Sequence, residues 1–152
     1  MSGIYLHIPF CRKACHYCNF HFSTSANYKD EMVAALQKEM GLRKGELHAP
    51  VESIYFGGGT PSMVTAAQIK ALIHEVYLHF DVVDYPEITL EANPDDLTKP
   101  YLSALKESGV NRLSIGIQSF HDKELELMNR AHNRKQALQS VLWAQELFDN
   151  IS

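Results

Sequence analysis

The chain has 152 residues, of which 45% are hydrophobic and 21% charged, and its formal net charge is −4. This length fits one domain, and the composition is that of a globular protein, which excludes disordered, collagen-like and coiled-coil chains. The slight acidity argues against nucleic acid or an anionic membrane as the main partner. No stretch has the length and hydrophobicity of a membrane span, and the first residues lack a signal-peptide pattern, so we expect a cytoplasmic protein.

Short apolar runs alternate with helical patterns along the whole chain. The runs expected to form strands cover residues 3–8, 51–56, 87–92 and 112–118. Helical spacing of apolar residues follows each run, over residues 28–47, 69–80, 99–108, 121–128 and 135–148. Thr65 and Gln68 form a capping box before the second helix, and Gly109 is a natural stop for the third. Strand followed by helix, repeated in this way, predicts a parallel α/β sheet or barrel with right-handed connections.

All three cysteines lie in a short loop directly after the first expected strand. Cys11, Cys15 and Cys18 have the spacing C-x3-C-x2-C. An odd number of cysteines grouped this tightly suits a metal site better than a set of disulfides. Three thiolates on one loop can hold a [4Fe–4S] cluster and leave one iron without a protein ligand, which is an open position for chemistry.

Two alternatives to a cluster remain open on spacing alone. The first is a structural zinc site in which one histidine, His7, His16 or His21, joins the three thiolates. The second is three reduced thiols that bind no metal. Arg12 and Lys13 stand beside the cysteines in the sequence, and we expect their charges to favour the thiolate form.

The other expected strands also end in polar or glycine-rich features. Residues 57–60 (Gly-Gly-Gly-Thr) let backbone N–H groups approach a ligand closely, and no Gly-Lys-Ser/Thr of a Walker loop follows them. Glu91 lies at the end of the third strand and Gln118 at the end of the fourth. Taken singly, the glycine turn is compatible with a structural role and Glu91 with a surface ion pair. Because the carboxyl ends of parallel strands meet at one edge, we expect these features and the cysteine loop to form one site.

The cysteine spacing resembles that of the radical S-adenosylmethionine (SAM) superfamily. Five further segments resemble one subgroup of this superfamily, which holds the oxygen-independent coproporphyrinogen III oxidases and the haem chaperones (HemW). These segments are residues 5–10, 55–62, 90–94, 112–120 and 129–132. The resemblance implies an α/β fold, an incomplete parallel (β/α)6 barrel with about four βα units present. Residues 1–152 would be the N-terminal part of the radical SAM core domain, truncated at the start of the fifth strand.

The resemblance also implies cofactors and their contacts. Cys11, Cys15 and Cys18 would bind a [4Fe–4S] cluster, and SAM would be the second cofactor. The residues carried over as SAM contacts are Tyr5, Tyr17, Gly58, Gly59, Thr60, Glu91, Gln118 and Arg130. Arg130 is equally compatible with a solvated cation at a helix end. The remaining histidines, His132 among them, are expected to be ordinary surface or core residues.

The residues after the third cysteine distinguish the two branches of the subgroup. The oxidase branch carries a fourth cysteine two residues later, whereas Cys18 here is followed by Asn19 and Phe20, an ending that resembles the haem chaperone branch. We therefore expect a chaperone that carries haem to target proteins. The alternative is oxidative decarboxylation of coproporphyrinogen III. An electron donor and a haem-accepting protein would be partners, and the haem-binding residues would lie beyond residue 152. With no complete fifth strand beside it, the fourth strand would be an open apolar edge of the sheet.

Overall fold

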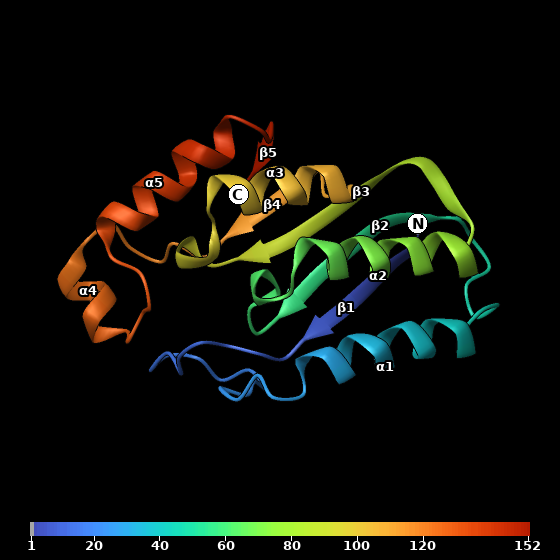
Figure 1. Ribbon diagram of the computed structural model, residues 1–152, viewed down its shortest axis with the longest axis horizontal. Coiled ribbons are helices and arrows are strands. Elements are labelled where there is room, and N and C mark those ends of the chain that lie inside the picture. Colours follow the sequence, from blue (N-terminus) through green and yellow to red (C-terminus); the bar gives the residue numbers. More distant parts are fainter. Residues whose placement is uncertain (1) are drawn as a thin grey trace.

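Five parallel strands lie side by side in chain order in the computed structural model, which describes residues 2–152 (Figure 1). The strands are β1 (Ser2–Ile8), β2 (Val51–Gly58), β3 (Val82–Ala92), β4 (Arg112–Ile115) and β5 (Asn150–Ile151). The helices are α1 (Lys29–Leu42), α2 (Ala66–His79), α3 (Lys99–Ser108), α4 (Asp122–Leu127) and α5 (Arg134–Gln145), with short 3-10 turns η1 (Pro61–Met63) and η2 (Pro94–Asp96). This order confirms the predicted α/β class with its βα units. Within residues 2–152 the sheet runs from β1 to β5 without closing on itself.

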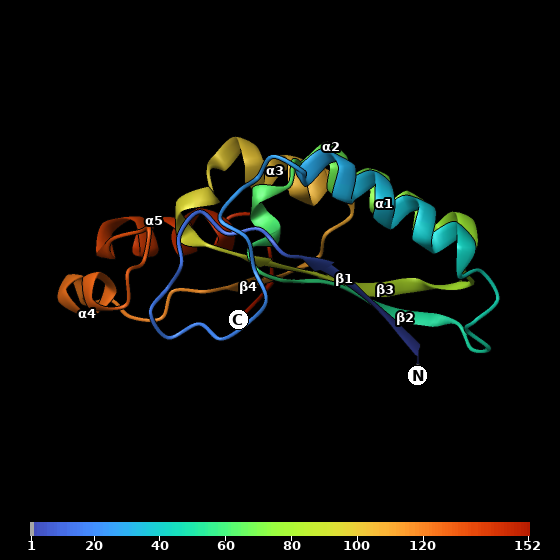
Figure 2. The same cartoon turned by 90° about the horizontal axis from the view of Figure 1, so that it is seen from below.

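The core lies between the sheet and the helices α1, α2 and α3, which cover the same face of the sheet (Figure 2). One row of side chains crosses the sheet at matching positions of neighbouring strands: Leu6, Phe56, Leu90, Leu113 and Ile151. All but Ile151 are buried, and each contributes about 1.5–3 kcal/mol by leaving water. The alternating burial of the strands therefore fixes which of their residues face the helices.

The opposite face of the sheet is polar. Alternate residues point to opposite faces of a strand, so the neighbouring row consists of Tyr5, Tyr55, Thr89, Arg112 and Asn150. Figure 2 shows that no helix of the described chain covers this side. A parallel sheet with its helices on one face is the arrangement of a segment of a barrel wall.

Local signals place two helix boundaries as predicted and a third one differently. The Thr65 side chain accepts a hydrogen bond from the Gln68 N–H, and the Gln68 side chain accepts one from the Thr65 N–H, both at 3.2 Å, which confirms the capping box of α2. Gly109 ends α3 in a left-handed conformation with φ of 105°. The first helix was expected to be longer, but α1 ends at Leu42 and a turn follows in which Gly45 has φ of 89°.

The fourth strand is shorter than predicted. The apolar alternation predicted a strand over residues 112–118, but β4 ends at Ile115. The chain then turns tightly twice: the Ile117 N–H donates to the Ile115 carbonyl at 2.9 Å, and the Ser119 N–H donates to the Ile117 carbonyl at 2.8 Å. Gln118 therefore lies in a loop beyond the strand, with φ of 66°, a conformation that costs about 1–3 kcal/mol.

The prediction that β4 has an open apolar edge is wrong for most of its length. Leu113 pairs with Ile151 of β5, and the two chains run parallel. The Ser152 N–H donates to the Leu113 carbonyl at 3.0 Å, and the Ile115 N–H donates to the Ser152 carbonyl at 2.8 Å. The outer edge of the described sheet is therefore the short strand β5. Among residues 2–152, no helix is long and apolar enough to cross a membrane.

Candidate functional site

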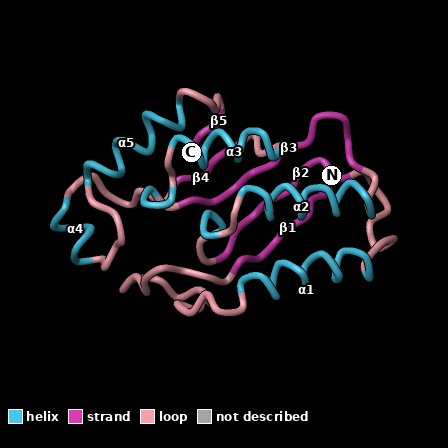
Figure 3. The backbone as a smooth tube through the Cα atoms, viewed as in Figure 1, coloured by secondary structure: helices cyan, strands magenta, loops and turns pink. Residues whose placement is uncertain are grey.

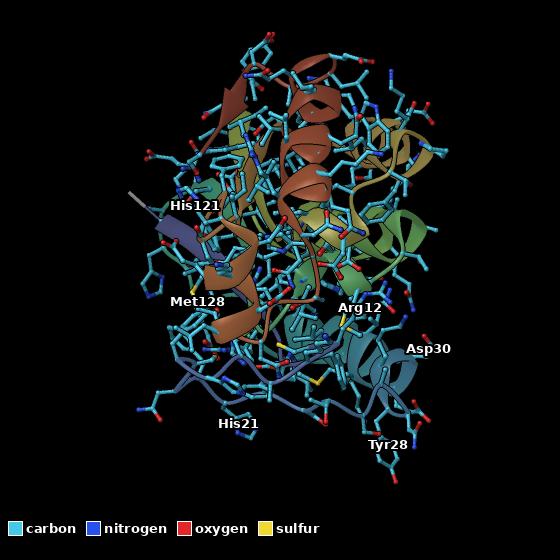
Figure 4. The ribbon with its side chains drawn as sticks, turned by 90° about the vertical axis from the view of Figure 1, so that its left-hand side faces the viewer. Arg12, His21, Tyr28, Asp30, His121 and Met128 are labelled. Atoms are coloured by element: carbon cyan, nitrogen blue, oxygen red, sulfur yellow. The ribbon has the colours of Figure 1, made fainter. Side chains whose placement is uncertain are left out.

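The carboxyl ends of β1 to β4 surround one pocket of about 260 Å³. Figure 4 looks onto this end of the molecule, with the cysteine loop below and α4, which the labelled Met128 directly follows, above it. Every residue that the sequence predicted for the site lines the pocket, with the exception of Tyr5; they are Cys11, Cys15, Tyr17, Cys18, Gly58, Gly59, Thr60, Glu91, Gln118 and Arg130. The expectation that the strand ends meet at one site is therefore confirmed in the geometry.

The cysteine loop contains no helix or strand, and Figure 3 shows it as a long irregular segment between β1 and α1. Its base is tied by two backbone hydrogen bonds: the Cys11 N–H donates to the Ser23 carbonyl at 2.9 Å, and the Ser23 N–H donates to the Pro9 carbonyl at 2.7 Å. Its tip is tied to the end of α4, since the Asn129 side chain donates to the Ala14 carbonyl at 2.8 Å. The loop is thus held at both ends, although it has no regular structure.

Hydrogen-bond donors reach two of the three thiols. The Thr60 hydroxyl donates to Cys11 Sγ at 3.5 Å, and Arg130 Nη1 donates to Cys15 Sγ at 3.4 Å. Burial raises the pKa of the Cys11 thiol, the Thr60 hydrogen bond lowers it, and the nearby sulfurs of Cys18 and Cys15 raise it further. A positively charged metal bound by the three sulfurs would overcome the raised pKa, because coordination deprotonates a thiol outright.

The expected role of Arg12 beside the thiols is wrong. Its guanidinium turns away from the sulfurs and pairs with Asp96 at 2.6 Å and with Asp95 at 3.5 Å, both of them in or next to the η2 turn. These carboxylates neutralise the charge that was expected to favour thiolates. Arg130, more than a hundred residues further along the chain, supplies the cation that contacts a thiol instead.

Glu91 is held in a fixed position at the pocket. Its Oε1 accepts a hydrogen bond from the Tyr55 hydroxyl at 2.7 Å, and its Oε2 accepts one from the Gly58 N–H at 3.2 Å. Burial, and next the hydrogen bond to Glu91, raise the pKa of Tyr55, so this phenol stays a donor at neutral pH. Tyr5 does not line the pocket but stacks on Tyr55 with ring centres 5.9 Å apart, and burial, followed by the charge of Glu91, raises the pKa of Tyr5.

Tyr55 and Asn93 belong to the site although the sequence did not single them out. Both lie inside segments that carried the family resemblance. The alternation of strand residues offered a signal for Tyr55, because Tyr55 pairs with Thr89 and so shares the face of Glu91. Asn93 follows β3 directly, and its role depends on contacts with distant loops that no local pattern reveals.

Arg130 joins the end of β4 to the cysteine loop. Its Nη2 donates to the Gly116 carbonyl at 2.6 Å and to Asn93 Oδ1 at 2.7 Å. Its Nη1 donates to Cys15 Sγ and, at 3.3 Å, to the Tyr17 hydroxyl. The alternative of a solvated helix-end cation is therefore wrong, since the guanidinium is an organising part of the pocket.

His132 is more than an ordinary residue of the core. It is buried, and its ring Nε2 donates to the Ile117 carbonyl at 3.0 Å, which supports the turn that precedes Gln118. Its other ring nitrogen, Nδ1, faces Asp95 Oδ1 at 4.0 Å, and neither atom has a hydrogen-bond partner. Burial, followed by the charge of Arg130, lowers the pKa of His132.

The donor set of the loop fits an iron–sulfur cluster. The three cysteines are free thiols, and all of them line the same pocket. Among residues 2–152, no group of three or more Cys, His, Asp or Glu side chains is placed so that it could hold a metal ion directly. A cubane cluster presents a separate iron to each thiolate, so its ligands need not meet at one point.

Comparison with known proteins identifies the superfamily of the chain. The family model of the radical SAM superfamily matches residues 5–152, and the chain therefore belongs to this superfamily. Its relatives include the haem chaperone HemW of Bacillus subtilis, which is 40% identical over 100% of this chain and 41% of that protein. Another is the radical S-adenosyl methionine domain-containing protein 1, mitochondrial, of Mus musculus, which is 40% identical over 97% of this chain and 34% of that protein.

A solved structure extends the comparison to the fold. The coproporphyrinogen III oxidase HemN of Escherichia coli, described as a radical SAM enzyme, superimposes with a TM-score of 0.84 and 28% sequence identity. The match covers 96% of this chain and 34% of that one. The chain thus spans less than half the length of these relatives, and its sheet corresponds to part of a radical SAM barrel.

Proposed function

We propose that this chain is part of a haem chaperone that binds a [4Fe–4S] cluster and SAM and delivers haem to target proteins. Residues 1–152 would be the N-terminal part of its radical SAM core domain. The main support is the pocket, where three free thiols, the donors Thr60 and Arg130 and the carboxylate of Glu91 face one another. The identity to HemW, and the Asn19-Phe20 ending after the last cysteine, favour the chaperone branch.

Each part of the pocket has a role in this proposal. Cys11, Cys15 and Cys18 hold the cluster, which when bound supplies an electron for reductive cleavage of SAM. Glu91, oriented by its two donors, accepts hydrogen bonds from a hydroxyl or ammonium group of SAM. The backbone of Gly58 and Gly59 can approach the methionyl part of SAM closely because glycine has no side chain, and Thr60 continues this contact.

The remaining predicted contacts surround these groups. Tyr17, Gln118 and Arg130 line the pocket wall, and the ring of Tyr5 stacks on that of Tyr55. Together they would orient SAM and keep water away from it. In this proposal no residue of the described chain acts as an acid, base or nucleophile.

The second candidate function is that of an oxygen-independent coproporphyrinogen III oxidase. It is favoured by the 28% identity to HemN over 96% of this chain. The missing fourth cysteine after Cys18 favours the chaperone over the oxidase. Haem or a porphyrin is the expected partner in both cases.

The proposed setting of the protein follows from its thiols. Three reduced cysteines that must stay available for a cluster suit the reducing cytoplasm. An electron donor and a haem-accepting protein are the expected protein partners. Nucleic acid is not expected as one, because the chain has a net charge of −4.

Anaerobic reconstitution of the complete protein with iron and sulfide tests the cluster. We expect a coloured protein with about four irons and about four sulfides per chain, and loss of both in Cys15→Ser. A colourless protein that holds one zinc and no sulfide would end the proposal. Haem titration, together with an assay for oxidation of coproporphyrinogen III, then separates the branches. Haem binding without turnover supports the chaperone, and clear turnover replaces it with the oxidase.

A further inference from the structure

One side-chain amide connects the donors of two thiols. Asn93, in the segment between β3 and η2, accepts a hydrogen bond at Oδ1 from Arg130 Nη2 at 2.7 Å. Its Nδ2 donates to Thr60 Oγ1 at 3.1 Å. Its backbone N–H is fixed as well, because it donates to Ser62 Oγ at 3.1 Å. The amide is therefore held at three points between two segments that are far apart in the sequence.

The polarity of this amide is determined by its partners. A guanidinium has only donors, so the atom of Asn93 that faces Arg130 must be the oxygen. The amide nitrogen must then face Thr60 and occupy an acceptor site on its hydroxyl oxygen. The single hydroxyl proton of Thr60 is left to point to Cys11 Sγ, 3.5 Å away.

The other end of the amide acts on the second thiol. By accepting from Arg130 Nη2, Asn93 and the Gly116 carbonyl hold one edge of the guanidinium plane. The other nitrogen, Nη1, is then directed at Cys15 Sγ, 3.4 Å away. Thr60 and Arg130, two of the donors that reach the thiols, thus take their orientation from the same residue.

We propose that Asn93 is a positioning residue that aims Thr60 at Cys11 and Arg130 at Cys15, and thereby raises the reduction potential of the cluster these cysteines hold. Hydrogen bonds to the sulfur ligands stabilise the reduced cluster, which is the more negative form. The inference rests on the proposed cluster site, and it goes further by assigning a role to an uncharged residue that is not one of the cluster's ligands.

The test measures the midpoint potential of the reconstituted cluster in the complete protein, followed by electron paramagnetic resonance in the absence of SAM. Asn93→Leu removes both hydrogen bonds without changing charge, and we expect a lower potential than in the wild type. Thr60→Val should give a part of this shift, and Thr60→Ser should give none because it keeps the hydroxyl. In the double variant, Thr60→Val should add little to the change in potential caused by Asn93→Leu, because both substitutions act on the same hydrogen bond, from Thr60 to Cys11 Sγ.

Asn111 offers a matched control at the opposite end of the strands. Its side chain also bridges two backbone groups, since Oδ1 accepts from the Ile88 N–H and Nδ2 donates to the Pro86 carbonyl, both at 2.8 Å. Asn111→Leu should cost comparable stability and leave the potential unchanged. A shift of equal size in this control would show a general effect of destabilisation and overturn the inference.

The remaining outcomes separate this inference from the proposed function. Unchanged potential in a fully loaded Asn93→Leu protein, or full additivity with Thr60→Val, refutes the role of Asn93 alone. A wild type that forms no cluster refutes the proposed function and the inference with it. If the Asn93→Leu protein binds no cluster, Asn93→Asp is used in its place. The carboxylate introduced by Asn93→Asp still accepts a hydrogen bond from Arg130, but it also accepts the Thr60 hydroxyl proton and so removes it from Cys11. The change in potential caused by Asn93→Asp should therefore be smaller when Thr60 is already replaced by valine. An undiminished shift there refutes the inference.

Discussion

Replacing Gly59 by alanine will displace the cysteine loop, because a methyl group has no room at this position. The added carbon would lie 2.8 Å from the Phe10 carbonyl oxygen, 2.9 Å from the Phe10 nitrogen and 3.0 Å from Cys11 Sγ, where ordinary contacts begin at 3.4 Å. These neighbours are backbone atoms and a short side chain that cannot rotate away. The loop or the end of β2 must therefore retreat by about 0.5 Å.

The cost of this retreat can be set against the small gain that alanine brings. Overpacking costs about 1–3 kcal/mol, and the reduced freedom of the unfolded chain offsets about 0.4–1 kcal/mol of it. We expect Gly59→Ala to lower the free energy of unfolding by about 1–2 kcal/mol. It should also lower the iron content, because Cys11 moves. Urea unfolding of the cluster-free protein and iron analysis after reconstitution measure the two effects.

Gly57 provides the control for this prediction. A methyl group there would approach the ring of Tyr5 at 2.8 Å and the ring of Tyr55 at 2.9 Å, which are outer side-chain atoms and not backbone atoms of the cysteine loop. Gly57→Ala should therefore leave the cysteine loop in place and retain full iron, whatever its cost in stability. If Gly59→Ala proves as well loaded with iron as Gly57→Ala, the loop is not constrained by backbone packing and the reasoning is refuted.

Three further predictions concern the polar contacts. Tyr55→Phe removes a donor from Glu91, a hydrogen bond to a charged group worth about 1.5–3 kcal/mol, and should weaken SAM binding at least about tenfold by calorimetry; an unchanged dissociation constant would contradict it. Burial lowers the pKa of His132 from its ordinary value of 6.5, so the contribution of the neutral ring to stability is present above pH 6.5 and is lost as the pH falls below it. The difference in unfolding free energy between the wild type and His132→Gln should therefore decrease as the pH falls below 6.5. Arg12→Gln should lower stability by only about 1 kcal/mol, since the arginine is half exposed although Asp96 is buried, and a loss several times larger in urea unfolding would argue against this.

Local patterns in the sequence were sufficient for the order of the elements and for the common location of the site. Residue spacing alone reveals a capping box such as that of Thr65 and Gln68, or a glycine stop such as Gly109. The meeting of Cys11, Gly59 and Glu91 follows from topology, since parallel strands place their carboxyl ends at one edge.

Long-range polar contacts account for what the sequence did not reveal. The apolar alternation continues past Ile115, but the carbonyl groups of the next two residues accept hydrogen bonds from the side chains of Arg130 and His132, and the strand ends early. Arg12 looked like a partner of the neighbouring thiols, yet Asp96, at a sequence separation of 84 residues, holds it. Such choices between competing partners depend on the folded arrangement, and no local propensity encodes them.

The tie between the cysteine loop and the end of α4 has a consequence for the order of events during synthesis. The cysteines leave the ribosome early, whereas Asn129 and Arg130, which hold Ala14 and Cys15, follow more than a hundred residues later. At about 5–20 residues per second the delay is on the order of ten seconds. In the proposed function, the cluster site is therefore complete only after α4 and Arg130 have emerged, and cluster insertion is a late step.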